Sequence, residues 1–541
     1  MPPAAGSRVI ESDVCIIGSG ISAAMVADRL ARTTGASVVV AEAGDDVPAL
    51  QHRPALRDRF LRYGESPWPA DHLEGYEIEG PLQSRSMQVG GLAMHWGGVT
   101  PRFSPEDFRL RSLYGVGSDW PVSYDELEPW YQEAEEVMGV AGEQGPIDMD
   151  PRQKPFPMPP LPLAYNLAQL KEWASGAGIA MWSQPSAKNS LPYRGRAACC
   201  RNDTCTPICP VGAKYSPDFT WTPLRRSGRV TLHPRVLVRR LILDRRSMRV
   251  SHAEAVRRDR NSTPLEFHAR LFVVAGGYVW SSHLLLLSAS SRAPTGIANR
   301  SGLVGRYLAG HRNVQAFVAL PRRLYPGLNG QHSLVTKQFM RTAPRADGRY
   351  LRHDLRIWES SVGRAPRLRN DAGELMLGDE ILHDWRARTL DGTARVRAYY
   401  DVIPDRDSAL TLDGRRRNRH GDPLPALAFR DASESAALRE WSEGQIRGLI
   451  EGMARSGRGT VIRFEADDDN FQDHPAGGCR MGVDPATSVV DSWGRAHDHD
   501  NLFVVGAPTC VSGGCANATL TFCALSLRSD SAMASGLPGR G

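Results

Sequence analysis

Residues 13–44 read DVCIIGSGISAAMVADRLARTTGASVVVAEAG, and this stretch predicts the fold of the N-terminal part of the chain. An apolar run at 14–17 has the length of a buried strand and passes directly into a glycine-rich loop. A helix-forming segment follows, and a second apolar strand at 38–40 leads to Glu42. Strand, glycine loop, helix, strand and acid in this order predict an α/β domain of Rossmann type that binds a dinucleotide.

The small residues of the loop each have a physical role in such a site. Gly18 permits the tight turn, Gly20 lets a pyrophosphate approach the backbone, and Ala23 lets the helix pack close to the strand. Free N–H groups at the helix start face the phosphates. Glu42 follows the second strand, where a carboxylate accepts hydrogen bonds from a ribose diol. These residues alone do not distinguish one dinucleotide from another, and an ordinary small-residue turn is the alternative interpretation.

Size and composition narrow the class of protein. A chain of 541 residues exceeds the size at which one core keeps growing, so we expect two domains. No apolar run is long enough to span a membrane, and the N-terminus lacks the charged-then-apolar order of a signal peptide, so we expect a cytoplasmic protein. The net charge of +6 comes from scattered arginines, which predicts no nucleic-acid-binding face. Nine cysteines argue against a secreted disulfide framework.

Two polar side chains lie in glycine-rich turns near the C-terminus. His474 lies in a His-x-x-Gly-x-Cys-Arg-Met-Gly loop, a strand at 501–505 runs into Gly506, and Asn517 precedes an apolar helix. A neutral imidazole accepts a hydroxyl proton while an amide fixes the oxygen, so that the carbon-bound hydrogen leaves as hydride. His474 and Asn517 are therefore the predicted catalytic pair, although either residue taken singly is more often structural.

A third glycine-dense segment, GGLAMHWGG, contains Gly90 and Gly91 followed by His95 and Trp96. Such glycine density suits backbone that lies against a flat ligand.

Four cysteines are bunched in ACCRNDTCTPICPVGAKY, residues 198–215. Closely spaced thiolates hold metal clusters, and the prolines of this loop would stiffen it. The spacing matches neither a usual zinc site nor the bacterial ferredoxin run, so free thiols or a local disulfide stay an alternative.

Between the motifs, the pattern divides the chain into regions. Ser123 and Glu126 form a predicted capping box at the start of a helix, and strand-like runs occupy 229–243 and 265–277. From about 313 to 462 the pattern changes to strand-like pieces, arginine-rich loops and one plausible helix over 434–455. We therefore expect a second domain there.

Seven ordered segments of this chain resemble the glucose-methanol-choline (GMC) family of FAD-dependent alcohol and sugar oxidoreductases. They are the Gly18 loop with Glu42, GGxxxHWGG, DWPVSYDELEPWY, VVAGGYVWSSHLLLLS, SGLVGRYLAGH, HPAGGCRMG and NLFVVGAPTCVSGGCANATLT. The resemblance covers the cofactor-binding portions well and residues 313–462 poorly. It implies an FAD-binding domain from 1–310, in which 106–195 is partly connector and cap, a sheet-based substrate domain over 311–465, and a C-terminal part of the FAD domain over 466–541.

The resemblance also assigns roles to residues. His474 matches the family's catalytic base and Asn517 its second position, and both cofactor-binding and catalytic functions are expected at Asn517. The cofactor-binding residues implied for FAD are Gly18, Gly20, Ala23, Glu42, Gly90, Gly91, His95, Trp96, Val238, Ala275, Gly506, Asn517 and Thr519. In similar pyranose oxidases the histidine equivalent to His95 is bonded covalently to the flavin, but those enzymes have Thr where Gly97 stands here. Non-covalent FAD is the favoured prediction.

The cysteine loop resembles the iron–sulfur loop of bacterial FAD glucose dehydrogenases, in which three of four thiolates hold a [3Fe-4S] cluster. The implied ligands are Cys199, Cys205 and Cys209, with Cys200 as the spare or a possible ligand. Electrons would leave through the cluster to an acceptor or a small partner subunit, with which such enzymes are in some cases exported to the periplasm.

The resemblance implies oxidation of a hydroxyl of a sugar, glycoside or aminosugar to a carbonyl. The alternatives are an O2-using pyranose or glycoside oxidase that releases hydrogen peroxide without a cluster, an aminoglycoside or aminosugar dehydrogenase of a biosynthetic pathway, and a non-catalytic flavoprotein. Carboxylates just before His474 would favour a cationic aminosugar, although a solvated acidic loop is the simpler interpretation. They are Glu465, Asp467, Asp468, Asp469 and Asp473.

Overall fold

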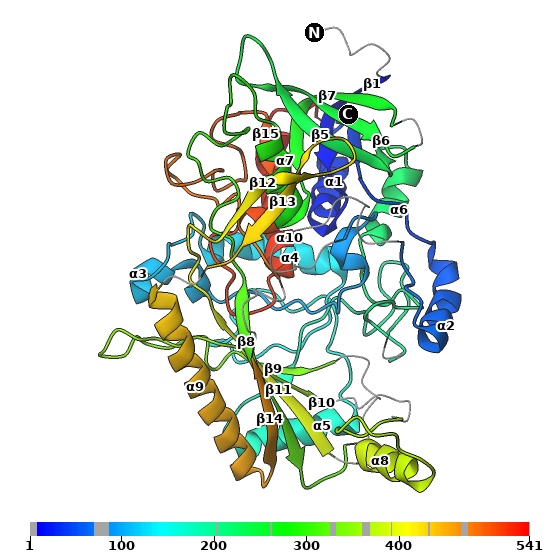
Figure 1. Cartoon of the computed structure of the whole chain (residues 1–541), viewed down its shortest axis with the longest axis vertical. Helices are drawn as coiled ribbons and strands as arrows, with labels where there is room; N and C mark the ends of the chain where they lie inside the picture. The colour runs from blue at the N-terminus through cyan, green and yellow to red at the C-terminus, as the bar shows by residue number, and fades with distance from the viewer. Residues whose placement is uncertain are drawn as a thin grey trace.

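The computed structural model describes residues 8–69, 86–201, 204–259, 262–324, 332–359, 368–390, 392–430, 433–466 and 474–539. Two sheets lie one above the other along the long axis of the molecule, and the first strand and the last helix both lie in the upper half (Figure 1). None of the helices in these ranges has the length and apolar character needed to cross a membrane.

The upper sheet is built around the opening stretch of the sequence. Its strands are β1 (Arg8–Ile17), β2 (Val38–Ala41), β4 (Val230–His233), β5 (Val236–Leu243), β6 (Val250–Arg257), β7 (Pro264–Val274) and β15 (Leu502–Val504). The order is β4-β2-β1-β7-β6-β5, and β15 also pairs with β7. The strands β4, β2, β1, β7 and β15 pair in parallel, while β5 and β6 are antiparallel. This sheet and its helices confirm the Rossmann-like α/β prediction, and the strand-like run at 229–243 forms two strands.

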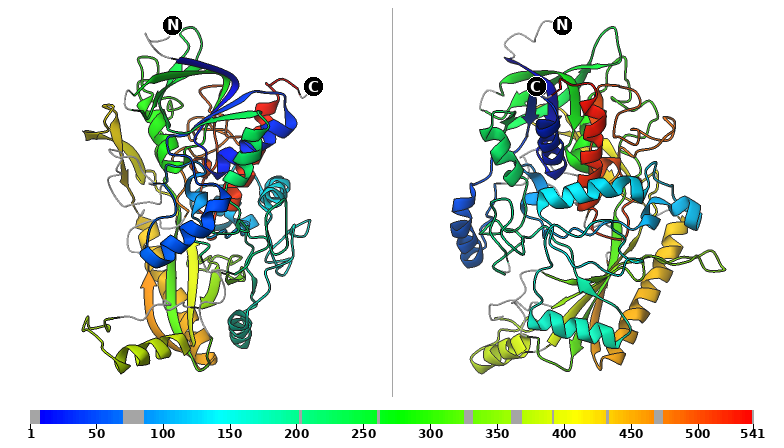
Figure 2. Two further views of the ribbon diagram at one scale, coloured as in Figure 1. Left: turned by 90° about the vertical axis from the view of Figure 1, so that its right-hand side faces the viewer. Right: turned by 180° about the vertical axis from the view of Figure 1, so that it is seen from behind.

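Helices cover both faces of the upper sheet. The main ones are α1 (Ile21–Thr33), α4 (Tyr124–Met138), α6 (Asp218–Arg226), α7 (Gly277–Leu287) and α10 (Thr519–Ala534). α1 packs its small residues on the central strands, so that Ala23 and Val26 share one core with Val14. The red C-terminal helix α10 lies beside the blue α1 in the view from behind (Figure 2). The segment farthest from the start of the chain therefore completes the first domain.

α4 begins with the predicted capping box. The Ser123 hydroxyl accepts a hydrogen bond from the Glu126 amide at 3.2 Å, and the Glu126 carboxylate accepts one from the Ser123 amide at 2.8 Å. The helix then buries Leu127 and Tyr131, which confirms the predicted apolar spacing.

The lower sheet is antiparallel and has the order β14-β8-β11-β10-β9-β3. Its strands are β3 (Trp182–Ser183), β8 (His311–Leu320), β9 (Leu334–Thr336), β10 (Leu355–Glu359), β11 (Gly392–Asp401) and β14 (Thr460–Ala466). One face packs on α5 (Tyr165–Gly176) and α9 (Ser433–Ser456), and α5 crosses the sheet in the view from behind (Figure 2). α9 corresponds to the helix predicted over 434–455.

A two-stranded hairpin, β12 (Ala409–Arg417) and β13 (Pro423–Ala428), packs on the upper half of the molecule. Its Leu410 and Leu427 share a core with Tyr278 and Val279 of α7. The predicted domain boundaries stay predictions. The remaining helices are η1 (Leu50–His52), α2 (Arg53–Tyr63), η2 (Gly91–Met94), η3 (Pro105–Phe108), α3 (Leu110–Tyr114), α8 (Asp379–Leu390) and η4 (Ala507–Thr509).

A buried arginine joins the two halves. The guanidinium of Arg352 donates to Asp107 of η3 at 2.8 Å and to Asp401 of β11 at 2.9 Å, and none of its side chain is exposed. Burial raises the pKa of Asp401 to about 6, and the charge of Asp107 adds to this rise while Arg352 acts in the opposite direction. Cys515 lies 3.9 Å from Asp107. The guanidinium supplies the counter-charge in this cluster, so the group is an interdomain ion pair and not a metal site.

Candidate active site

The first glycine loop has a shape that only glycine permits. Gly18 has φ +98°, and a Cβ at this position would lie 2.7 Å from the carbonyl oxygen of Ala275. Gly20 precedes α1 as its N-cap and makes no side-chain capping bond. A Cβ on Gly20 would meet no atom within 4 Å. The start of α1 therefore presents uncapped N–H groups to open space, as a phosphate site requires.

Glu42 fixes the shape of this loop through hydrogen bonds to its backbone and to Ser19. Its buried carboxylate accepts hydrogen bonds from the Ser19 amide at 3.0 Å, the Ser19 hydroxyl at 2.6 Å and the Gly44 amide at 2.7 Å. Burial raises the pKa of Glu42, while these hydrogen bonds act in the opposite direction. Val236 also donates its amide to the Glu42 carbonyl, which brings the start of β5 close to this turn. The ribose contact of Glu42 and the adenosine contact of Val238 stay predictions.

The second glycine segment lies on the first. The Gly90 amide donates to the Ser19 hydroxyl at 3.1 Å, and a Cβ on Gly91 would lie 3.3 Å from Gly20 Cα. Gln88 is fully buried, and neither end of its side-chain amide has a partner within the described ranges. Uncapped amides, an open glycine and an unpaired buried amide are features that a bound nucleotide would satisfy. The residues present therefore fit FAD.

The C-terminal turns also pack on this loop. Gly506 has φ +79°, and a Cβ there would lie 2.2 Å from the Ser22 hydroxyl at the start of α1. Thr519 is the first residue of α10. The structure thus brings Gly18, Gly20, Gly90 and Gly506 together around one helix start.

His474 and Asn517 meet directly. The Asn517 Nδ2 lies 2.9 Å from His474 Nε2, and His474 Nδ1 lies 3.3 Å from Nε2 of His311, the first residue of β8. An amide NH2 is a donor, so we assign the lone pair of His474 to Nε2 and the proton to Nδ1, which donates to His311. His474 is then a neutral imidazole whose basic nitrogen lies beside the amide of Asn517. The amide oxygen Oδ1 of Asn517 is buried and has no hydrogen-bond donor in the described parts of the chain.

Backbone geometry holds this pair in place. His474 itself has φ +60°, an uncommon value for a residue with a side chain. A Cβ on Gly477 would lie 2.2 Å from the Tyr307 carbonyl oxygen, and one on Gly513 would lie 1.9 Å from that of Gly310. Both turns therefore require glycine where they pass the loop that precedes β8, which positions His474 and Asn517 against the same strand.

Two residues of the lower sheet were not singled out from the sequence. His311 is fully buried and its ring lies 4.2 Å from that of Tyr399 on β11, which meets the His474 ring edge-on at 6.4 Å. The segment SGLVGRYLAGH ends in His311, and this was the one available signal. Tyr399 has no motif of its own, because only the pairing of β8 with β11 places it there.

The His95–Trp96 turn is tied to the cysteine loop. The Trp96 indole donates to the carbonyl of Tyr215 at 2.9 Å. The buried ammonium of Lys214 donates to the carbonyls of Trp96 at 2.7 Å, Cys205 at 2.6 Å and Met94 at 3.2 Å. Burial lowers the pKa of Lys214 to about 7, and the thiols of Cys205 and Cys209 counter this effect.

None of the four bunched cysteines forms a disulfide within the described ranges, and their environments differ. Cys205 and Cys209 are buried, Cys199 is half-buried and Cys200 is exposed. Burial raises the pKa of Cys199, while a hydrogen bond from the Arg201 backbone lowers it. Within the described residues these cysteines do not approach closely enough to share one ion. Thiols are the donor type that iron–sulfur clusters bind.

The acidic segment before His474 lies mostly outside the described residues. Asp467, Asp468, Asp469 and Asp473 belong to that part, and only Glu465 is described. The Glu465 carboxylate pairs with Arg463 at 2.9 Å on β14.

Comparisons with known proteins agree with this geometry. Residues 188–313 match the N-terminal domain of the GMC oxidoreductases and residues 404–526 the C-terminal domain. The chain is 32% identical to the fructose dehydrogenase large subunit of Gluconobacter japonicus, over 97% of this chain and 98% of that protein. It is 31% identical to paromamine 6'-oxidase of Streptomyces fradiae, over 98% and 92%. A solved pyridoxine 4-oxidase from Mesorbium loti has the same fold, with a TM-score of 0.60, 18% identity and coverage of 96% and 98%.

Proposed function

Because the chain belongs to the GMC oxidoreductase family of FAD enzymes that act on CH–OH groups, we propose that it oxidises a hydroxyl of a sugar or glycoside to a carbonyl. The observation that supports this proposal most strongly is the 2.9 Å contact between Asn517 Nδ2 and His474 Nε2. This contact places a neutral base beside an amide, and the oxidation of a substrate hydroxyl requires both a proton acceptor and a group that holds the oxygen.

Individual residues of the chain would have separate roles in this reaction. His474 Nε2 would accept the hydroxyl proton, and its Nδ1–H bond to His311 would keep the imidazole in the required tautomer. The unsatisfied Oδ1 and the Nδ2 of Asn517 would hold polar groups of the substrate. FAD, when bound at the glycine loops, would supply the acceptor for the hydrogen that leaves the carbon with its electron pair.

For the second half of the reaction we propose that the cysteine loop holds a [3Fe-4S] cluster. Cys199, Cys205 and Cys209 would be the ligands, because Cys205 and Cys209 are buried and Cys199 is half-buried, whereas Cys200 is exposed. A cluster there would carry electrons away from the flavin. Lys214 would hold the cysteine loop against the turn that contains His95 and Trp96. One relative is named as the large subunit of fructose dehydrogenase. We therefore propose that a small partner subunit accepts the electrons from this chain. The cytoplasmic location stays a prediction.

A second candidate is an O2-using sugar oxidase without iron, possible because the chain is also 31% identical to an enzyme named as an oxidase. Its substrate could be an aminosugar, as that relative's name indicates for that protein.

The test is an anaerobic screen in which flavin absorbance is followed after addition of neutral sugars, sugar acids, glycosides and aminosugars. Bleaching by at least one of these supports the function, and no bleaching by any of them contradicts it. Iron content and peroxide release after oxygen is admitted then separate the two candidates. Iron without peroxide indicates the dehydrogenase, and peroxide without iron the oxidase.

A further inference from the structure

Arg352 is bound by groups from three segments that are far apart in the sequence. Its guanidinium donates to Asp107 of η3 at 2.8 Å and to Asp401 of β11 at 2.9 Å. It also donates to the Ser104 hydroxyl at 3.1 Å and to the Met340 carbonyl at 2.9 Å. All three guanidinium nitrogens therefore have an acceptor, and the side chain is fully buried. A planar fork with this set of acceptors has one fixed orientation.

One of the two carboxylates lies beside the turn that carries Asn517. Asp107 Oδ1 is 3.9 Å from the Sγ of Cys515, two residues before Asn517 in the chain. The neighbouring Gly514 packs so closely on Phe103 that a Cβ at this glycine would lie 2.7 Å from the phenyl ring. The turn therefore packs on the segment that the guanidinium holds.

The other carboxylate lies beside the strand that begins with His311. The register of β8 and β11 pairs Asp401 with His311. Paired residues of antiparallel strands have their side chains on the same face, with Cβ atoms about 5 Å apart. His311 Nε2 is 3.3 Å from His474 Nδ1, and His474 Nε2 is 2.9 Å from Asn517 Nδ2. The contacts of Arg352 thus lead through each of its two carboxylates to the same catalytic pair.

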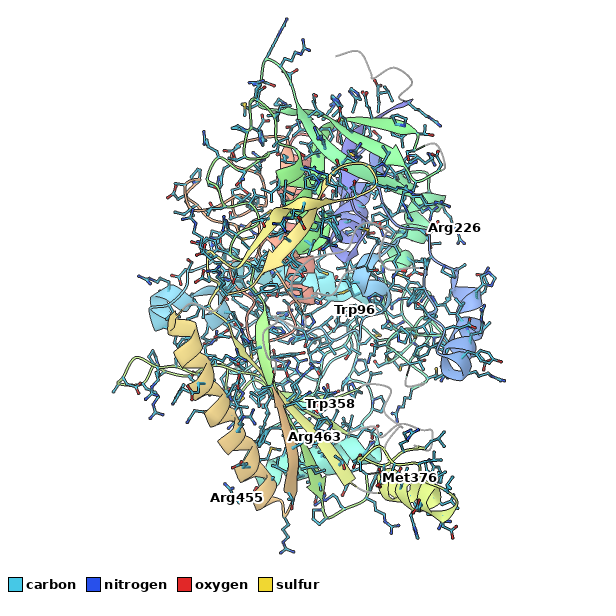
Figure 3. The ribbon with its side chains drawn as sticks, viewed as in Figure 1. Trp96, Arg226, Trp358, Met376, Arg455 and Arg463 are labelled. Atoms are coloured by element: carbon cyan, nitrogen blue, oxygen red, sulfur yellow. The ribbon has the colours of Figure 1, made fainter. Side chains whose placement is uncertain are left out.

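Arg352 also connects the cores of the two halves. The strand that follows it, β10, belongs to the lower sheet, where Trp358 is labelled in Figure 3. Ile357 of this strand is part of the core under α5 and α9. Phe103 and Cys515 belong instead to the core that contains residues of α4 and α10. The guanidinium therefore fixes a turn of one half relative to β8 and β11 of the other.

We propose that Arg352 is a positioning residue, which holds the turn of Asn517 so that its amide stays at hydrogen-bonding distance from His474. This inference rests on the proposed function, in which both groups bind one substrate hydroxyl. Arg352 acts through Asp107 and Asp401 and does not bind the substrate itself. A displacement of about 1 Å between reacting groups lowers a rate by up to about a hundredfold, so the loss of the guanidinium should appear in the reaction step.

The test uses the FAD-loaded wild type, Arg352→Lys and Arg352→Met. The substrate is the compound that bleaches the flavin fastest in the anaerobic screen, and a concentration series gives the limiting rate of flavin reduction and the half-saturating concentration. FAD content and the thermal unfolding temperature are measured on the same samples. Lys337→Met is the matched control, because Lys337 is 3% exposed and forms another buried ion pair, with Asp150 at 2.5 Å.

We expect Arg352→Lys to lower the limiting rate about tenfold, since an ammonium is a point charge that cannot hold both carboxylates in the geometry of a planar fork. Arg352→Met should lower it about a hundredfold. The half-saturating concentration should change less than about threefold in both variants, because the interaction that is lost acts in the transition state. Lys337→Met should lower the unfolding temperature and keep the limiting rate within about twofold of wild type.

A double variant separates positioning from a general loss of structure. In the background of Asn517→Ala, Arg352→Lys should slow the reaction less than about twofold further, because the group that it positions is absent. A tenfold loss in both backgrounds would show that Arg352 does not act through Asn517.

Two other outcomes contradict the inference while the proposed function stands. They are a wild-type limiting rate in Arg352→Lys, and an equal loss of rate in Arg352→Lys and Lys337→Met. If no compound reduces the flavin of the wild type, the proposed function and the inference are both wrong. Should neither Arg352 variant bind FAD, Asp107→Asn replaces them, with an expected loss of about fivefold that is absent in the background of Asn517→Ala.

Discussion

The candidate catalytic pair and the cysteine loop are built in opposite ways. His474 and Asn517 come from two separate turns that meet through one hydrogen bond, and His311 of the lower sheet supports them. The four cysteines come from a single stretch of 11 residues, 199–209. The geometry of the first site is set by the packing of separate segments of the chain. The second is a local set of thiols that would bind the proposed cluster, so the two should respond differently to substitution.

The largest expected effect follows from the cysteines. Cys205→Ala or Cys209→Ala should reduce bound iron to background, because each removes one of three ligands. Anaerobic reduction of the flavin by a substrate should stay within about twofold of wild type, since the candidate catalytic pair lies on other elements. Iron analysis and flavin absorbance measure the two quantities on one sample.

Cys200→Ala is the control, because Cys200 is the exposed thiol, and it should keep its iron. If Cys205→Ala retains wild-type iron, the ligand assignment is wrong. If it loses flavin reduction along with iron, the two sites are not separate.

The second prediction concerns the pair itself. Asn517→Ala should slow anaerobic flavin reduction by about a hundredfold, because the amide that holds the substrate hydroxyl beside His474 is lost. Iron content should not change. Asn517→His should recover part of the rate, since an imidazole also offers a donor and an acceptor. A rate for Asn517→Ala equal to that of wild type would remove this residue from the proposed site.

Lys214 joins the cysteine loop to the turn that contains His95 and Trp96, and it tests what holds that loop in place. Lys214→Met removes three hydrogen bonds to the carbonyls of Met94, Trp96 and Cys205. Hydrogen bonds from a charged donor contribute about 1.5–3 kcal/mol each, although such values do not add. We expect iron to be lost to a chelator several-fold faster.

The matched control is Lys171→Met, because Lys171 is 36% exposed and pairs with Glu143 at 3.0 Å. A surface pair of this kind contributes at most about 1 kcal/mol. Equal rates of iron loss in Lys214→Met and Lys171→Met would show that Lys214 does not hold the cysteine loop.

The smallest expected effect is on the pH dependence of protein stability, to which the ion pair between Arg352 and Asp401 contributes. The pKa of Asp401 is about 6 in the folded protein and near 3.8 when exposed. A carboxyl group with a raised folded pKa binds more protons in the native state, so its contribution to stability falls as pH rises from about 4 to about 6. Each pKa unit corresponds to about 1.4 kcal/mol.

Asp401→Asn should remove this part of the slope in a plot of thermal unfolding temperature against pH. Asp407→Asn, at a carboxylate that is 64% exposed, should leave the slope as in wild type. A wild-type slope in Asp401→Asn would mean that Asp401 is ionised throughout this range.

A structural feature could be predicted from the sequence when a short stretch of residues encodes it. The Gly18 loop, the Ser123 capping box and the helix over 434–455 are encoded within short stretches, and all three were predicted from the sequence. His474 and Asn517 were found because each lies in a glycine-rich motif. His311 ends one of the motifs but was not singled out, and Tyr399 carries no such signal because only the register of β8 and β11 places it near His474.

The most direct test of the proposed reaction is anaerobic flavin reduction by His474→Ala with and without added imidazole. We predict that this variant binds FAD, reduces it at least about a hundredfold more slowly than wild type, and recovers part of the rate when free imidazole replaces the missing base. Reduction by His474→Ala at the wild-type rate, with no response to imidazole, would contradict the assignment of His474 as the proton acceptor.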